Sequence, residues 1–332
     1  MMRVVLMMFV AGVSLLAQTQ PDRSKSWTPP KTPWGDPDLQ GMWPGNMGVP
    51  LQRPVNMGDR TALTDAEFAA KQAQAKKQAQ ADSQSTAASD SVGIGPPSYW
   101  VERGTPTRQT SLIVDPPDGR LPPLTAAEQE LRKQARGGKG FPGEWRGEAN
   151  SYADLNLYYR CITRGVLGSI IPVIYNNGNE ILQAPGYVII RNEMIHEARV
   201  IPLDGRPHLA PAIRQYMGDS RGHWEGNTLV IETTNFTDKD AIGSNGAGYP
   251  GDPGHHSADL KLIERLTLAD ANTLSYEATI DDPKTWTRPW TILIVLKRNE
   301  KYQLLEYACH EGNIAMGDIL SGARAEESKK TK

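Results

Sequence analysis

The sequence has little cysteine and no excess of charge of either sign. Only two cysteines occur in 332 residues, which excludes a disulfide-rich scaffold and Cys-x-x-Cys metal sites. The formal net charge is -2, with 36 basic and 38 acidic residues intermixed. Because nucleic-acid binders carry a strongly basic surface, nucleic acid is not expected as a partner.

Long apolar runs are also missing. The longest, Val4–Leu16, follows Arg3 and precedes a polar, Pro-rich stretch. This layout is typical of a secretory signal peptide, and the run is too short to span a bilayer comfortably. We therefore predict a signal peptide over residues 1–18, a periplasmic or secreted location, and no membrane span after cleavage. An uncleaved N-terminal anchor is the alternative.

Several local signatures of cofactor chemistry are absent. The chain has no phosphate-cradling P-loop, no Gly-x-Gly-x-x-Gly after a strand and no His-Glu-x-x-His. We accordingly predict neither a cofactor nor a metal ion.

Residues 19–157 are predicted to form an extended, Pro/Gly-rich and partly helical region. Thr64, followed by Asp65 and Glu67, indicates the start of a solvated helix that ends near residue 83. An apolar strand, a Pro-Pro-Asp-Gly turn and a second extended piece predict one hairpin over 110–125. A short helix over 125–138 follows, and the whole region is expected to wrap around another part of the chain.

From residue 158 the pattern changes to short β-type runs separated by turn residues, which favours a sandwich or a barrel. Hairpin-length connections between the runs predict an antiparallel meander over residues 158–327. A short helix over 312–327 is expected to close over one end, before a disordered tail at 328–332. The predicted strands are 186–194, 195–203, 227–236, 259–268, 272–280, 290–298 and 302–309.

Five motifs closely resemble those of a family of uncharacterised exported bacterial proteins, a likeness that covers most of the mature chain. These motifs are PWGDPDLQGMW, LIVDPPDGRLPPLT, GDSRGHWEGNTLVIETTNF, DDPKTWTRPWT and YACHEGNIAMGDILSGARAEE. Gly41-Met42-Trp43 is also similar to the Gly-x-Trp that opens lipocalin-type barrels. That second resemblance implies a closed antiparallel barrel whose mouth holds one small ligand.

Cys161 and Cys309 lie far apart in sequence. In an oxidising compartment two distant cysteines of one exported domain are expected to form a disulfide; two buried free thiols are the alternative.

Two histidines are candidates for acid/base chemistry. In a strand over IHEARVI, His196 shares the more apolar face with Met194, and His310 follows the last predicted strand. Asp219 or Glu277 could orient such a histidine. The structural alternative is a hydrogen-bonded core histidine.

Two further segments are candidates for ligand binding. Asp219, Arg221 and Trp224 crowd the approach to one tight hairpin, where they bind a ligand or simply fix the turn through an Asp219–Arg221 pair.

The second segment is DDPKTWTRPWT, in which Trp286, Arg288 and Trp290 alternate and therefore fall on one strand face. An arginine between two indoles either recognises an anion or packs structurally. Arg265 is a further candidate for binding the same ligand.

Three functions remain open from the sequence. The first is an exported small-molecule-binding β-barrel protein whose ligand is partly apolar and possibly anionic. The second is a periplasmic lyase, isomerase or hydrolase that uses a histidine in the barrel lumen. The third is an envelope scaffold that uses its Pro/Trp-rich N-terminal segment as contact surface. The sequence leaves the ligand and the oligomeric state open.

Overall fold

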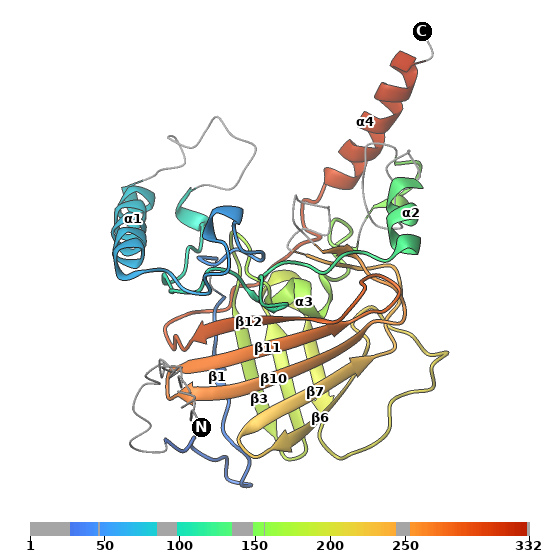
Figure 1. The fold of residues 1–332 in the computed structure, drawn as a ribbon. Coiled ribbons are helices and arrows are strands. Elements are labelled where there is room, and N and C mark those ends of the chain that lie inside the picture. Colours follow the sequence, from blue (N-terminus) through green and yellow to red (C-terminus); the bar gives the residue numbers. More distant parts are fainter. Residues whose placement is uncertain are drawn as a thin grey trace, which may run out of the picture.

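The computed structural model describes residues 27–45, 47–84, 98–134, 149–155, 157–243 and 253–330. It is mainly β, with antiparallel sheets and few helices (Figure 1). The predicted signal peptide, residues 1–18, lies outside the described residues. Within the described ranges, no helix combines the length and apolarity needed to cross a membrane.

The smaller sheet has four strands in the order β1-β3-β4-β5. Their bounds are Gly41–Met42, Asn179–Ala184, Tyr187–Asn192 and Ala198–Pro202. The β3–β4 hairpin turns at Gly186, whose φ of 79° suits a residue without a Cβ atom. Consecutive strands pair as an antiparallel meander, as predicted.

The larger sheet has six strands in the order β2-β12-β11-β10-β7-β6. Their bounds are Ile113–Asp115, Trp290–Lys297, Thr273–Asp281, Lys261–Asp270, Thr228–Thr234 and Asp219–Glu225. A small pair, β8 (Ala241–Ile242) and β9 (Gly254–His255), lies outside both sheets. The meander again follows chain order, with β2 added at one edge.

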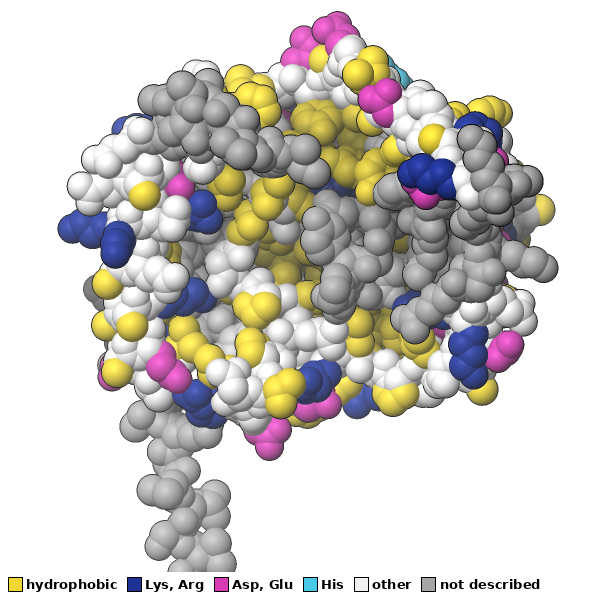
Figure 2. All heavy atoms as spheres, turned by 90° about the horizontal axis from the view of Figure 1, so that it is seen from above, with side chains coloured by type: hydrophobic (Ala, Val, Ile, Leu, Met, Phe, Trp, Pro, Cys, Tyr) yellow, Lys and Arg dark blue, Asp and Glu magenta, His cyan; other side chains and the backbone are white. Residues whose placement is uncertain are grey.

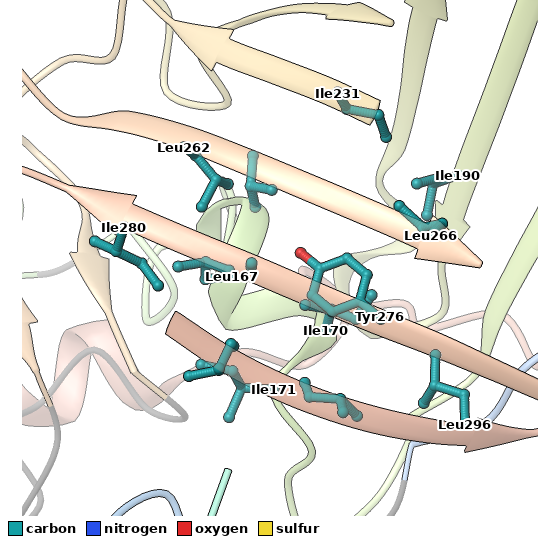
Figure 3. Packing of buried hydrophobic residues seen from close by; sticks show 14 of the residues in the cluster. Leu167, Ile170, Ile171, Ile190, Ile231, Leu262, Leu266, Tyr276, Ile280 and Leu296 are labelled. Atoms are coloured by element: carbon teal, nitrogen blue, oxygen red, sulfur yellow. The ribbon is translucent and has the colours of Figure 1, made fainter. Parts of the chain in front are cut away.

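Apolar side chains fill the space between the sheets. Alternate residues of each strand point inward, and the short helix α3 (Gly165–Ile170) is buried along its whole length against them. Figure 3 labels ten of the packed residues, from both sheets and from α3: Leu167, Ile170, Ile171, Ile190, Ile231, Leu262, Leu266, Tyr276, Ile280 and Leu296. The sequence predicts a ligand-holding lumen, whereas this part of the interior is a packed core.

One buried ion pair joins the two sheets through this core. Arg199 on β5 places Nη1 and Nη2 2.5 and 2.7 Å from the carboxylate oxygens of Glu264 on β10. The Tyr276 hydroxyl on β11 donates to the same carboxylate at 2.9 Å. Burial raises the pKa of Tyr276 well above its usual value, so this hydroxyl stays protonated. The donors that compensate for burial of the Glu264 carboxylate thus come from the opposite sheet and from the neighbouring strand.

Three α-helices lie outside the sheets: α1 (Asp65–Gln84), α2 (Ala126–Gln134) and α4 (Ala315–Lys330). The predicted start of α1 is confirmed, because Thr64 Oγ1 accepts from Glu67 N and the Glu67 carboxylate accepts from Thr64 N. Four 3-10 turns lie within the described residues: η1 (Val55–Met57), η2 (Ser98–Trp100), η4 (Tyr152–Asp154) and η5 (Met194–His196).

Several predicted elements differ from the structure. Both pieces of the expected 110–125 hairpin pair with the segment that contains β12 instead of with each other. Residues 302–309 form no strand, and the residues 328–330 of the expected tail are helical. Helix α4 extends away from the sheets and packs on Ala149, Leu155 and Tyr159 (Figure 1).

Candidate functional site

The Cys161–Cys309 disulfide forms, as predicted, with the two sulfur atoms 2.01 Å apart. It joins the loop before α3 to the irregular segment after β12, 148 residues further along the chain. His196 Nδ1 lies 3.0 Å from the carbonyl oxygen of Tyr307, so the turn before β5 is held at the same place. The disulfide therefore anchors one end of the molecule, where three distant loops meet.

A pocket of about 740 Å³ lies beside this disulfide. Its volume falls in the range typical of small-molecule sites, roughly 300–1,000 Å³. Viewed from above, the end of the molecule that carries α1 and α4 is hollowed, and hydrophobic side chains gather there (Figure 2). The described lining residues come from three parts of the chain, around residues 99–102, 175–176 and 305–311. They are Tyr99, Trp100, Val101, Glu102, Tyr175, Asn176, Leu305, Glu306, Tyr307, Ala308, Cys309 and Glu311.

Aromatic rings form much of the pocket wall. The Trp100 ring packs edge to face on Tyr99 and on Tyr175, with centroids 6.3 and 6.4 Å away. Trp100 is nevertheless 56% exposed and Tyr99 47% exposed. Burying a large aromatic ring contributes about 1.5–3 kcal/mol, so rings left open beside a pocket indicate a surface that a ligand can cover.

The floor of the pocket continues into a cluster of tyrosines. Tyr158, Tyr175 and Tyr307 pack together on a small core of Val173, Met194 and Ile195. Burial raises the pKa of Tyr175 and of Tyr307, and interaction with the Tyr158 hydroxyl adds to both shifts. The hydroxyls of Tyr175 and Tyr307 therefore remain neutral at physiological pH and can donate hydrogen bonds.

Charged side chains lie behind the tyrosines. The Arg164 guanidinium is 4% exposed and sits 5.3 Å from the centroid of the Tyr158 ring. Burial lowers its pKa, against the opposing effect of the tyrosines and of Asp240. Desolvation raises the pKa of Asp240 to about 7 and also raises that of Glu197, which accepts from Thr163 Oγ1 at 2.5 Å. A buried arginine near a carboxyl whose pKa is strongly raised by desolvation, as with Arg164 and Asp240, is typical of functional sites.

Unusual backbone conformations bring these groups together. Gly165 has a φ of 71°, and a Cβ atom there would lie 2.1 Å from Asp240 Oδ2, so only glycine allows this approach. Ile195 and His196 adopt φ values of 60° and 44°, which costs free energy for residues with a Cβ atom. Because of this kink, the strand predicted over 195–203 starts only at Ala198, as β5.

The two candidate histidines lie at this end of the molecule, but on its surface. Because of the kink, His196 is exposed and does not share an inward face with Met194, which is 2% exposed. His310 is exposed in the turn that follows Cys309, since residues 302–309 form no strand to direct it inward. Neither histidine lies between the sheets.

The arginines expected to bind an anion are paired on the surface instead. Arg265 and Glu277 are cross-strand neighbours on the outer face of the larger sheet, and Arg265 contacts Glu225 at 2.7 Å. Arg288 is 49% exposed and binds both carboxylate oxygens of Asp115 at 2.9 and 2.7 Å. The structure does not bring these residues to the pocket.

The expected ladder of two tryptophans and one arginine does not form. A turn over residues 283–285 and a bend before β12 break the alternation that the prediction assumed. Trp286 and Trp290 are 1% and 0% exposed and pack edge to face, with centroids 5.4 Å apart, whereas Arg288 points to solvent. The two indoles belong to the core.

Asp219 holds a loop in place through several hydrogen bonds. Arg221 Nη1 lies 2.6 Å from Asp219, which also accepts from Leu209 N at 2.9 Å and lies 3.1 Å from His208 Nδ1. This network fixes the 208–219 loop, as the structural alternative proposed. Trp224, on the same strand, packs at the edge of the main core.

The stretch Gly218-Asp219-Ser220-Arg221-Gly222 has the Gly-x-Ser-x-Gly spacing of a hydrolase nucleophile turn. Ser220 lies within strand β6, is 6% exposed and shares a 2.9 Å hydrogen bond with Thr233 Oγ1. It is therefore not on the exposed strand-to-helix turn that such a nucleophile requires.

The tyrosine cluster was not found by sequence reasoning. Tyr158, Tyr175 and Tyr307 belong to no common motif. The one sequence signal is that Tyr158 and Tyr307 each lie within three residues of a cysteine, Cys161 and Cys309. Among the described residues, no group of three or more His, Cys, Asp or Glu side chains is placed to hold a metal ion. The chain matches no protein-family model, and no curated protein matches it.

Proposed function

We propose that this protein is exported and binds a small, partly apolar molecule in the pocket beside the disulfide. The observation that carries the proposal is the pocket wall, in which Trp100 and Tyr99 remain about half exposed around 740 Å³ of space. Concave sites lined by aromatic rings with a few polar groups are the usual form of small-molecule sites. Export is supported by the signal-type N-terminus and by the Cys161–Cys309 disulfide.

The finer fold proposal is a lipocalin-like open barrel built from the two sheets. Contacts between β5 and β6 support it at one side. At the other side, Arg298, just after β12, lies 4.4 Å over the Trp43 ring and donates to Gln40 O at 2.6 Å. The ligand pocket lies among end loops in this proposal, because α3 and the core side chains fill the middle.

Native mass spectrometry of the protein purified from its own exported fraction tests the binding proposal. A small molecule is expected to co-purify with the wild type and with Trp34→Ala, and to be lost in Trp100→Ala. Trp34 is the matched control because it is 37% exposed and not among the pocket residues. A wild type without any bound molecule, or a molecule retained equally in all three proteins, contradicts the proposal.

Catalysis is a second candidate, favoured by the raised pKa of Asp240, which lies near Arg164 and Glu197 and lines a small separate cavity and not the pocket beside the disulfide. In that case Asp240→Asn still binds the molecule but accumulates it unconverted, so the bound mass differs from that in the wild type. The same bound mass in both proteins favours binding alone. The third function, an envelope scaffold, has less support, since Leu39 and Trp43 of the N-terminal segment are both 0% exposed.

A further inference from the structure

Among the described residues, every charged side chain that lines the pocket beside the disulfide is acidic. The described lining contains Glu102, Glu306 and Glu311, and no lysine, arginine or histidine. Glu306 and Glu311 are exposed, so their carboxylates meet the pocket from its rim. Since opposite charge is the main determinant of which charged ligand a cleft attracts, this lining favours a cation.

Glu102 is held in place by two residues. It accepts from the backbone and side-chain nitrogens of Asn177, both at 2.9 Å, and lies 2.8 Å from the Tyr302 hydroxyl, which is shared with Glu193 at 2.5 Å. Burial, with Glu193 and Glu102 beside it, raises the pKa of Tyr302, so the tyrosine remains a donor. The carboxylate is thus fixed at the wall next to Trp100 before any ligand arrives, which lowers the cost of ordering it on binding.

The aromatic wall has the same charge preference. The faces of tryptophan and tyrosine rings carry partial negative charge and attract ammonium groups positioned over them. Trp100, Tyr99 and Tyr175 form a corner of mutually inclined rings, with interplanar angles of 89° and 76°, so a ligand in the corner meets ring faces from more than one direction. Anions gain nothing from such faces.

Resting on the proposed small-molecule function, we propose that the ligand is an organic cation: an ammonium group attached to an aromatic or aliphatic body. The ammonium lies between the ring corner and the glutamates, and the apolar body covers the exposed rings. This replaces the anionic ligand expected from the sequence, whose arginines pair elsewhere.

Three probes that share one phenyl group and differ in charge test the proposal: phenethylamine, phenethyl alcohol and hydrocinnamate. Isothermal titration at neutral pH and low salt measures the affinity of the full mature protein for each. The amine is expected to bind at least about tenfold more tightly than the alcohol, and hydrocinnamate most weakly. The double variant Glu306→Gln/Glu311→Gln should lose part of the amine preference, because Glu102 and the aromatic rings remain, and its affinity for the amine should fall by more than its affinity for the alcohol.

Glu130→Gln is the control, because it changes one charge on helix α2 at a residue that does not line the pocket. Equal affinities for the three probes, or tightest binding of hydrocinnamate, overturn the cation proposal while leaving small-molecule binding in place. Failure of the amine to bind also overturns it, and a co-purified neutral or anionic molecule would then identify the true ligand class. Loss of all probe binding in Trp100→Ala, with folding intact by circular dichroism, locates the binding in this pocket.

Discussion

Removal of the Arg199 guanidinium leaves the Glu264 carboxylate buried without its charge partner. The pair is 8% and 0% exposed and is bidentate, so breaking it by Arg199→Met should cost about 3–5 kcal/mol. The Tyr276 hydroxyl alone cannot balance the charge. With total stabilities of about 5–15 kcal/mol for folded proteins, a loss of this size is large.

Arg191→Met is the matched control, since Arg191 also lies on the smaller sheet and pairs with a glutamate, Glu180, at 2.8 Å. That pair is 48% and 23% exposed, so its loss should cost no more than about 1 kcal/mol. Urea unfolding of both variants at the same pH gives the comparison. Stability losses of similar size would refute the argument from burial.

The fully apolar replacement sharpens the test. Arg199→Met/Glu264→Leu/Tyr276→Phe removes the charges and the hydroxyl together, and should recover most of the stability lost in Arg199→Met. An unpaired buried carboxylate also has a raised pKa, so Arg199→Met should lose less stability at pH 5 than at pH 8, as its carboxyl becomes neutral. A triple variant as unstable as the single one, with no pH dependence, would show that the cost comes from packing.

Three other predictions concern the site. Cys161→Ser/Cys309→Ser should lose roughly 5 kcal/mol in the loop-closure model for a 148-residue separation; urea unfolding that shows no loss contradicts this. Burial raises the pKa of Asp240 from 3.8, its value in the unfolded chain, to about 7 in the folded protein. Its contribution to the free energy of unfolding therefore falls as pH rises from about 4 to about 7. Asp240→Asn should remove that slope in urea titrations, and an unchanged slope would exclude Asp240 as its source. Gly165→Ala should destabilise the protein by more than about 1 kcal/mol, because its Cβ atom meets Asp240 Oδ2; thermal unfolding equal to wild type would show that the carboxyl simply moves aside.

Much of the β structure could be predicted because its signals are local. Alternating apolar residues in β10, β11 and β12 and the turns between them determine both pairing and register. Helix α1 was predictable because Thr64 and Glu67 form a capping box within one turn of chain.

Residues 302–309 show why other elements could not be predicted. Their apolar pattern resembles a strand, but the Tyr302 hydroxyl lies between the Glu193 and Glu102 carboxylates, and Leu305 N donates to Glu193 Oε1. Hydrogen bonds to these two glutamate side chains replace the backbone pairing that a neighbouring strand would supply. A sequence pattern indicates which residues tend to be buried. It does not show whether their backbone is hydrogen-bonded by a neighbouring strand or by side chains.

The candidate site was only partly accessible to sequence reasoning, for a related reason. The cysteine pairing was predictable from compartment and even count. The tyrosine cluster depends on that pairing together with positive φ values at Gly165, Ile195 and His196, which no periodic pattern encodes. Histidine and arginine were chosen for their chemistry, whereas the pocket uses aromatic rings and glutamates from three separate loops.

The filled interior has a consequence for how this protein can change. Because the pocket walls come from loops near residues 99–102, 175–176 and 305–311, while Leu262, Tyr276 and their neighbours hold the sheets together, substitutions can alter the pocket without repacking the core. Related chains could therefore diverge in what they bind while keeping the same two sheets, and differences between them should concentrate in those three loops.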